Sequence, residues 1–230
     1  MELISAIFPI YKKWDLIHKR LWELAPLVAP YHFQVVLADD FSEDKQVEAG
    51  LKWWSRAGVF RNIKIISNEK NLGFGGNLNN AVDKCDGEIL ILHSTDVQIN
   101  GDYIKEILTK LKENPDALVG GRLLDYDTGW NKFGDKLFPY LEGWMICCKR
   151  DTWKKLGGFH PMYYPYDYED LHLSTQALEM GIELVPLNSP HLLHSGGATI
   201  YSVHGVEKRR THTEANRIKF EDYWVKGNRG

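Results

Sequence analysis

The run VVLADDFS, Val35–Ser42, is a short apolar segment that ends in two carboxylates before a Phe-Ser pair. A second run of this kind, ILILHSTD at Ile89–Asp96, also ends in an acid. Each has the length and composition of a buried strand. Ligands of open α/β sheets bind at the carboxyl ends of the strands, where carboxylates suit a divalent cation or the hydroxyls of a nucleotide. The two runs therefore predict an enzyme that acts on a phosphorylated, metal-chelating substrate.

Strand and helix patterns alternate along the first half of the chain. We expect strands at 3–8, 33–38, 62–67, 88–93 and 117–120, and helices at 13–25, 43–57, 75–84 and 101–113. Such alternation indicates right-handed βαβ crossovers and a mostly parallel central sheet with helices on both faces, an α/β, Rossmann-like domain. Later elements are expected at 151–156 and 169–180 (helices) and 182–186 (strand). No Pro/Gly/Ser-rich linker divides the chain, so we expect one domain over 1–204, with a charged, helical or mobile tail at 205–230 as part of it.

Composition narrows the class of protein. The 230 residues carry a formal net charge of −3, which shows no bias toward nucleic acid or an anionic membrane. Cys85, Cys147 and Cys148 lack zinc-site spacing and do not suggest a disulfide framework, which favours a reducing cytoplasm. No apolar stretch reaches the roughly 20 residues of a spanning helix. We therefore expect a soluble cytoplasmic protein with at most peripheral membrane contact.

A glycine-rich segment, NLGFGGN at Asn71–Asn77, opens the helix after the third expected strand. Its backbone N–H groups could cradle a phosphate or ribose, and a simple tight turn is an equal alternative. A dinucleotide fingerprint would instead follow the first strand with the spacing Gly-x-Gly-x-x-Gly. The segment therefore does not indicate dinucleotide binding.

Two further polar groups lie in the second half of the chain. Glu169 and Asp170 occupy the first turn of an expected helix, where the helix dipole alone favours acids. The same dipole would lower the pKa of Asp170. His194 lies in the otherwise apolar segment 191–197, where a hydrogen-bonded structural histidine is the common alternative to a ligand.

Seven short motifs, taken in order, resemble those of the family 2 glycosyltransferases. They are FPIY (8–11), DDFS (39–42), NLGFGGN (71–77), STD (94–96), GGF (157–159), EDL (169–171) and HSGG (194–197). The resemblance spans roughly residues 3–200, and NLGFGGN is most similar to the rhamnosyltransferase-like branch. It implies a GT-A fold, a UDP- or dTDP-sugar donor, a divalent Mn²⁺ or Mg²⁺ ion, and inversion at the anomeric carbon.

The resemblance also assigns roles to single residues. Asp170 matches the general base, Asp96 the last acid of the Asp-x-Asp metal motif, and His194 the histidine that completes metal or diphosphate contacts. Ser94 replaces the first acid of the metal motif, which predicts weaker metal binding or greater reliance on the other ligands. The residues assigned to the nucleotide sugar are Pro9, Tyr11, Asp39, Asp40, Asn71, Gly73, Gly76, Asn77, Thr95 and Glu169. Of these, Glu169 is expected to orient the acceptor or to shape its loop.

Aromatic residues of the second half are expected to shape the donor-sugar pocket, namely Trp130, Trp144, Tyr163, Tyr164 and Tyr166. The acceptor stays open among a polysaccharide, a lipid-linked sugar, a protein and another glycoside. Modified DNA is a minor option, because the chain lacks a strong positive balance. The basic run at 207–212 is either a solvated helix face or a lid that orders over the diphosphate.

Two other function classes compete with a transferase. A sugar nucleotidyltransferase would need a glycine-rich, basic loop right after the first strand, where this chain has PIYKK at 9–13. A catalytically degenerate nucleotide-sugar-binding protein would explain Ser94, although Asp170 and His194 are both retained.

Overall fold

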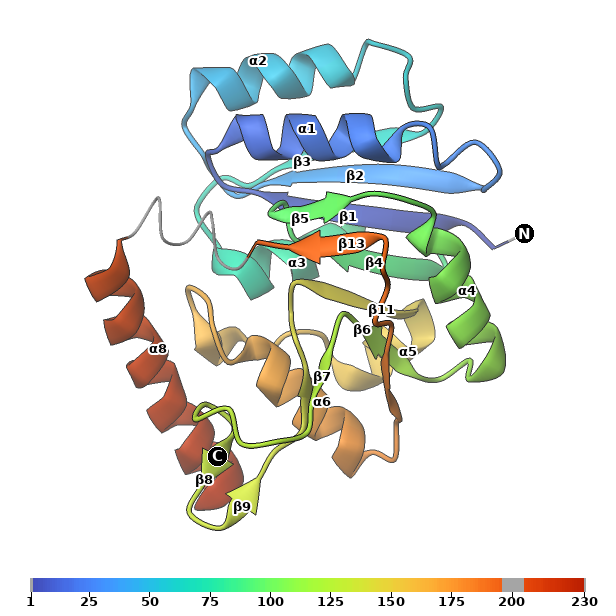
Figure 1. Ribbon diagram of the computed structural model, residues 1–230. Helices are drawn as coiled ribbons and strands as arrows, with labels where there is room; N and C mark the ends of the chain where they lie inside the picture. The colour runs from blue at the N-terminus through green and yellow to red at the C-terminus, as the bar shows by residue number, and fades with distance from the viewer. Residues whose placement is uncertain (1, 196–204, 230) are drawn as a thin grey trace.

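A seven-stranded sheet with the order β12-β6-β11-β4-β1-β2-β3 forms the centre of the molecule (Figure 1). The computed structural model describes residues 2–195 and 205–229. The sheet strands are β1 (Ile4–Ile10), β2 (Phe33–Asp39), β3 (Ile63–Ser67), β4 (Ile89–His93), β6 (Leu118–Gly120), β11 (Met145–Lys149) and β12 (Leu184–Pro186). Strands β3, β2, β1 and β4 run parallel. Their carboxyl ends therefore lie along one edge, and Asp39 pairs with Ile10 on one side and Ser67 on the other.

Helices cover both faces of this sheet. They are α1 (Trp14–Leu24), α2 (Lys45–Trp54), α3 (Gly73–Lys84), α4 (Tyr103–Glu113), α5 (Arg150–Leu156) and α6 (Glu169–Glu179). Apolar residues of α1, α2 and α4 form one core with the sheet, and those of α3, α5 and α6 form a second core. These helices match the expected helical ranges within about two to three residues at either end. The predicted α/β fold with a mostly parallel sheet is confirmed.

Strand β11 was not predicted, and it lies inside the sheet. It pairs antiparallel with β4 on one side and with β6 on the other. Its first four residues, Met145–Cys148, are buried. The segment follows an irregular aromatic stretch, so it lies outside the alternation of strand and helix patterns that predicted strands in the first half of the chain. The sheet is thus mixed at this point.

Short hairpins and a terminal helix complete the second half. The hairpin strands are β5 (Val97–Ile99), β7 (Leu123–Leu124), β8 (Lys132–Phe133), β9 (Lys136–Leu137), β10 (Tyr140–Leu141) and β13 (Leu192–His194). Helix α8 (Val206–Phe220) continues into a π-helical turn, Glu221–Val225. Phe220 and Trp224 are buried in a third cluster that also contains Tyr163, Tyr168 and Leu171. The charged tail is therefore a packed helix, and its role as a lid stays a prediction.

Within residues 2–195 and 205–229, none of the helices is both long enough and apolar enough to span a bilayer.

Candidate active site

Asp39 and Asp40 are neighbours at the carboxyl end of β2, but they face different surroundings. Asp39 is partly exposed and lines a cavity of about 700 Å³ beside α2 and β3. Its carboxylate accepts a hydrogen bond from the Ser42 hydroxyl at 2.5 Å. Asp40 is only 4% exposed and accepts hydrogen bonds from the backbone N–H groups of Leu72 (2.7 Å) and Gly73 (2.9 Å). Asp39 thus lines open space, whereas Asp40 is engaged by the backbone of the glycine-rich loop, and the predicted nucleotide contacts of both residues stay predictions.

The glycine-rich loop before α3 has its leading N–H groups bound to protein. Two of them donate to Asp40, and that of Phe74 donates to the carbonyl of Pro165 at 2.8 Å. Gly73 has φ +74°, and an added Cβ would lie 2.6 Å from the same carbonyl oxygen. The prediction of a phosphate cradle is therefore wrong for these three N–H groups. The loop is a close-packed joint between α3 and the segment before α6.

The remaining predicted residues of this loop also bind protein. The Asn71 amide donates to the carbonyl of Asp40 at 3.2 Å, and the buried Asn77 amide donates to that of Ala38 at 2.9 Å. A Cβ added at Gly76 would lie 3.1 Å from the Leu72 Cβ. None of these three residues lines the 700 Å³ cavity beside Asp39 or the cavity beside Asp96. Their contacts fix α3 to the end of β2, and their predicted contact with a nucleotide sugar stays a prediction.

Three other predicted contacts lie beside the same sheet edge. Pro9 and Tyr11 flank the position of β1 that pairs with Asp39. Thr95 is 8% exposed and lies between Ser94 and Asp96, which line a second cavity, of about 590 Å³, that we call the main cavity. Their contact with a nucleotide sugar stays a prediction.

Asp96 and His194 meet because β13 pairs antiparallel with β5. His194 lies opposite Val97, and its Nε2 atom is 3.5 Å from the Asp96 Oδ1 atom. The Ser94 hydroxyl donates to the same carboxylate at 2.6 Å. The Trp144 ring stacks on the imidazole, with 5.2 Å between ring centroids. The structure thus brings the two predicted metal ligands together.

This donor set fits a divalent cation in part. A carboxylate beside an imidazole suits Mn²⁺, which takes nitrogen ligands along with oxygen more readily than Mg²⁺ does. In the part of the chain that the structure describes, no group of three or more His, Cys, Asp or Glu side chains could hold a metal. The described protein ligands alone would leave coordination positions for oxygens of a bound diphosphate and for water.

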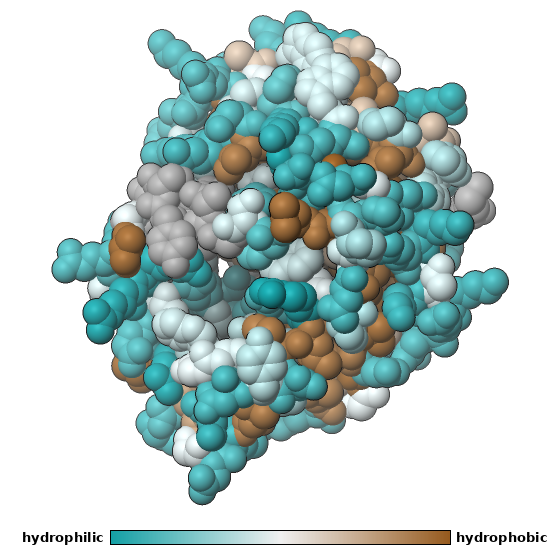
Figure 2. All heavy atoms as spheres, in the orientation of Figure 1, coloured by the Kyte–Doolittle hydropathy of each residue, from teal (hydrophilic) through white to brown (hydrophobic). Residues whose placement is uncertain are grey.

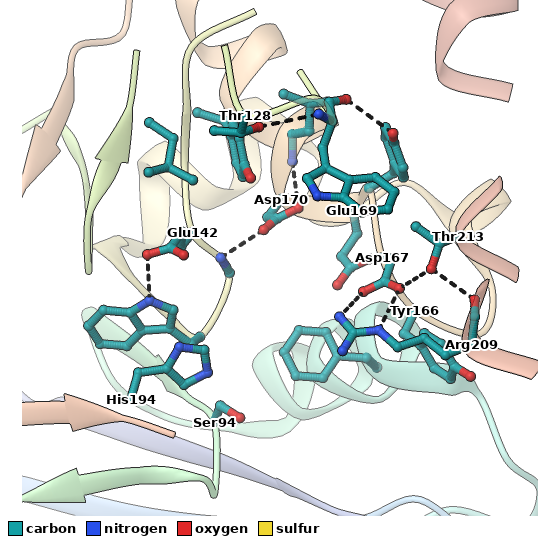
Figure 3. Close-up of a pocket in the computed structure, with 18 of the residues that line it drawn as sticks. Ser94, Thr128, Glu142, Tyr166, Asp167, Glu169, Asp170, His194, Arg209 and Thr213 are labelled. Carbon is teal, nitrogen blue, oxygen red and sulfur yellow. Dashed lines mark hydrogen bonds and ion pairs between the residues drawn. The ribbon is translucent and has the colours of Figure 1, made fainter. Parts of the chain in front are cut away.

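The main cavity opens beside this pair (Figure 3). Figure 2 shows an opening between α8 and the neighbouring strands on this face of the molecule. The walls come from the segment after β4, the β10–β11 connection, the start of α6 and the first half of α8. Its carboxylates are Asp96, Glu142, Asp167, Glu169 and Asp170.

Asp170 is fixed by two backbone donors. Its Oδ2 atom accepts from the Gly143 N–H and its Oδ1 atom from the Leu171 N–H, both at 2.8 Å. Burial raises the pKa of Asp170 to about 6 and outweighs these two hydrogen bonds. The expectation that the helix dipole would lower this pKa is therefore wrong. The carboxylate is ionised at neutral pH and basic enough to accept a proton.

Glu169 lines the same cavity in a different state. It is 7% exposed, and its Oε2 atom is buried with no hydrogen-bond partner among the described residues. Burial, and then the negative charges of Asp170 and Asp167, raise the pKa of Glu169 well above its usual range. Ionisation of Glu169 is therefore disfavoured by its surroundings, whereas the Asp170 carboxylate is stabilised by two backbone donors.

Helix α8 forms a wall that clamps the segment before α6. Asp167 pairs with Arg209 at 3.2 Å and accepts a hydrogen bond from the Thr213 hydroxyl at 2.6 Å (Figure 3). The buried Asn216 amide donates to three backbone carbonyls, those of Tyr163, Tyr166 and Asp167. None of these contacts was predicted, because they join segments about 40 to 50 residues apart that share no sequence pattern.

The β10–β11 connection supplies the other missed residues. Glu142 accepts a hydrogen bond from the Trp144 indole at 3.0 Å and pairs with Arg122. A Cβ at Gly143 would lie 2.9 Å from the Asp170 Cβ, so the close approach needs glycine here. In the sequence, this part of the site is marked only by a glycine, Gly143, between Glu142 and Trp144.

The predicted aromatic residues divide between cavity and core. Trp130, Trp144 and Tyr166 line the main cavity. Tyr163 is buried against the C-terminal cluster, and Tyr164 is 54% exposed, with its hydroxyl 3.4 Å from the Asn71 Oδ1 atom.

Comparison with known proteins gives a consistent picture. The family model "Glycosyl transferase family 2" matches residues 5–171. The uncharacterized glycosyltransferase sll0501 of Synechocystis sp. is 24% identical over 145 residues, which cover 62% of this chain and 45% of that protein. The chain thus spans about half the length of this curated relative.

Solved structures of similar fold come from several sources. The mannosyltransferase PcManGT of Pyrobaculum calidifontis, in complex with GDP-Man and Mn²⁺, superposes with a TM-score of 0.71 at 18% identity, over 94% of this chain and 64% of that one. GalNAc-T7 with UDP, GalNAc and Mn²⁺ gives 0.75 at 13% identity, over 98% and 49%. S. aureus TarS 1-349 gives 0.63 at 18% identity, over 99% and 74%. At these identities the likeness shows the fold.

Proposed function

The chain belongs to glycosyl transferase family 2, and from this premise we propose that it moves a sugar from a nucleoside-diphosphate sugar to an acceptor hydroxyl with inversion at the anomeric carbon. One observation carries the proposal. Asp170 lines the same cavity as Asp96 and His194, so a base and a site for the leaving diphosphate face a common space. A UDP- or dTDP-sugar is the proposed donor.

The proposed donor site runs from Asp39 to Asp96 along the carboxyl edge of the sheet. Asp39 is a hydrogen-bond acceptor for a ribose hydroxyl or a base N–H, and Pro9 and Tyr11 lie beside it. At the other end, Mn²⁺ or Mg²⁺ held by Asp96 and His194 would neutralise the charge that develops on the leaving diphosphate. The ligands of two structural neighbours, GDP-Man and Mn²⁺ in PcManGT and UDP, GalNAc and Mn²⁺ in GalNAc-T7, support this arrangement.

Asp170 is the proposed general base. As the acceptor oxygen bonds to the anomeric carbon, the bond from that carbon to the diphosphate breaks, and the hydroxyl proton passes to a carboxylate oxygen of Asp170. The Gly143 N–H fixes that carboxylate in place. Glu169 is less suited to this role, because burial and the charges of Asp170 and Asp167 disfavour its ionised form. We assign it instead to orienting the acceptor.

A thermal-shift panel tests the function. UDP, dTDP, GDP and CMP are added separately, each with and without Mn²⁺. At 100 times its dissociation constant, a ligand specific to the native state stabilises it by about 2.7 kcal/mol. We expect a metal-dependent rise in Tm with UDP or dTDP. No shift with any of the four nucleotides would contradict donor binding.

Asp96→Ala tests the metal ligands. We expect the variant to lose the Mn²⁺-dependent part of the nucleotide shift, because a carboxylate in direct contact with the cation is removed. The metal-free shift serves as the internal control and should persist. The exposed Asp83→Ala on α3 is the matched control and should respond to Mn²⁺ like the unaltered protein. An unchanged Mn²⁺ response in Asp96→Ala would remove Asp96 from the metal site.

A further inference from the structure

Trp130 is a large apolar side chain that the fold leaves half exposed at the main cavity. It lines the cavity and is 51% exposed, whereas the cavity-lining aromatic residues Tyr166 and Tyr168 are each 5% exposed. The exposed part of the indole is apolar surface that stays in contact with water, which is unfavourable. A ligand bound in the cavity would cover this surface.

The loop that carries Trp130 is built around one buried side chain. Asn131 is fully buried, and its amide donates to the carbonyls of Leu124 (3.3 Å) and Tyr126 (3.1 Å). Its side-chain oxygen accepts from both the N–H and the hydroxyl of Thr128, at 3.0 and 2.9 Å. Every hydrogen-bonding position of this amide is therefore used to set the loop's shape.

A second contact ties the loop to the catalytic segment. The Tyr168 hydroxyl donates to the Trp130 carbonyl at 3.1 Å, and Tyr168 lies two residues before Asp170. Tyr168 is itself packed against Phe220 of α8. The backbone that carries the indole is thus held beside the segment that carries the base, so this part of the loop needs little ordering when a ligand binds.

A rigid, half-exposed aromatic face beside polar groups matches one chemical class of ligand. Sugars present a patch of C–H groups on one side of the ring and hydroxyls around the rim. Such a ligand can cover an indole while its hydroxyls reach the carboxylates of the cavity. A small polar acceptor, such as a glycerol or a serine side chain, has no face of this kind to offer.

We propose that the acceptor is a saccharide and that Trp130 is its stacking platform, with one sugar ring of the acceptor covering the indole. This inference rests on the proposed transfer and assigns its acceptor class. It places Trp130 on the acceptor side, because its carbonyl binds Tyr168, two residues before the proposed base, whereas the sequence grouped it with the donor-sugar pocket.

Saturation-transfer NMR with simple glycosides tests the platform. The probes are the methyl glycosides of glucose, galactose, mannose, N-acetylglucosamine and rhamnose, added to the full chain with the nucleotide and Mn²⁺ present. We expect binding of at least one probe, a loss of about tenfold in its affinity in Trp130→Ala, and retention within about threefold in Trp130→Phe. Trp53→Ala is the matched control, because Trp53 is 48% exposed on α2 and lies outside the cavity. It should bind the probe unchanged.

Two readouts separate this inference from the function on which it rests. The nucleotide thermal shift and the slow hydrolysis of the donor by water need no saccharide acceptor, so both report on the donor site in the unaltered protein. If the unaltered protein binds nucleotide but none of the glycosides, or if Trp130→Ala binds them as tightly as the unaltered protein, the platform is overturned while the donor site stands. A missing nucleotide shift in the unaltered protein would instead count against the proposed function.

Discussion

Asp170→Asn is expected to lower the transfer rate by about 10²- to 10⁴-fold while nucleotide binding persists. The amide cannot accept the proton of the attacking hydroxyl, and a positioned general base contributes about this factor. The change keeps the shape of the side chain, so the cavity should be preserved. One of the two backbone donors, Gly143 or Leu171, would lose its carboxylate acceptor, which costs about 1 kcal/mol of unfolding free energy.

The pH dependence of the same residue gives an independent check. With its pKa raised to about 6, Asp170 is protonated below that pH, and kcat/KM should fall there. The sign for stability is opposite. A carboxyl whose folded-state pKa is raised stabilises the fold at low pH, and this contribution is lost as the pH rises through about 6. Asp170→Asn should therefore remove part of the stability loss between about pH 4 and 6, the window between the usual pKa of 3.8 and the raised pKa of about 6, as well as the activity. Equal transfer rates in the variant and the unaltered protein would contradict the base assignment.

Asp40→Ala is expected to destabilise the fold by about 3 kcal/mol or more. The buried carboxylate accepts hydrogen bonds from the N–H groups of Leu72 and Gly73 and from the Asn68 amide. Its removal leaves the Leu72 N–H and one Asn68 N–H without an acceptor, while the Gly73 N–H keeps the Asn71 Oδ1 atom at 3.2 Å. Each unsatisfied buried donor costs about 1–3 kcal/mol. Urea unfolding followed by circular dichroism measures the loss as a lower midpoint concentration.

Two neighbouring acids serve as controls for Asp40→Ala. Asp83→Ala, on the exposed side of α3, should change the unfolding free energy by no more than about 0.5 kcal/mol. Asp39→Ala should also cost less than Asp40→Ala, but should weaken the nucleotide thermal shift. If Asp40→Ala were as stable as Asp83→Ala, the glycine-rich loop would not depend on this carboxylate.

The first half of the fold could be predicted because its patterns are local. Buried strands and amphipathic helices alternate up to about residue 120, and a parallel sheet follows from that order. The positions of Asp39 and Asp96 at strand ends followed as well. Strand β11 could not be predicted, because MICCK has the same apolar character as a buried helix segment and lies outside the alternation.

The site itself depended on contacts that no local pattern contains. The side chains of Asp39 and Asp40 have different surroundings because of the backbone turn after β2. Asp39 lines a cavity, and the glycine-rich loop packs against Asp40. The meeting of Asp96 with His194 depends on the pairing of β5 with β13, about 95 residues apart. For Asp170, the helix dipole could be inferred from sequence, but the stronger effect of burial in the folded protein could not.

The position of β11 also has a consequence for synthesis of the chain. β4 is complete at residue 93, but its neighbour β11 spans Met145–Lys149. While a ribosome is still adding the residues between them, β4 carries five strongly apolar or core-facing residues, ILILH, along an edge that nothing has yet paired. Such an edge is a site of chain-to-chain association. A nascent polypeptide that pauses between β6 and β11 is therefore the form of this protein with the greatest need of a chaperone.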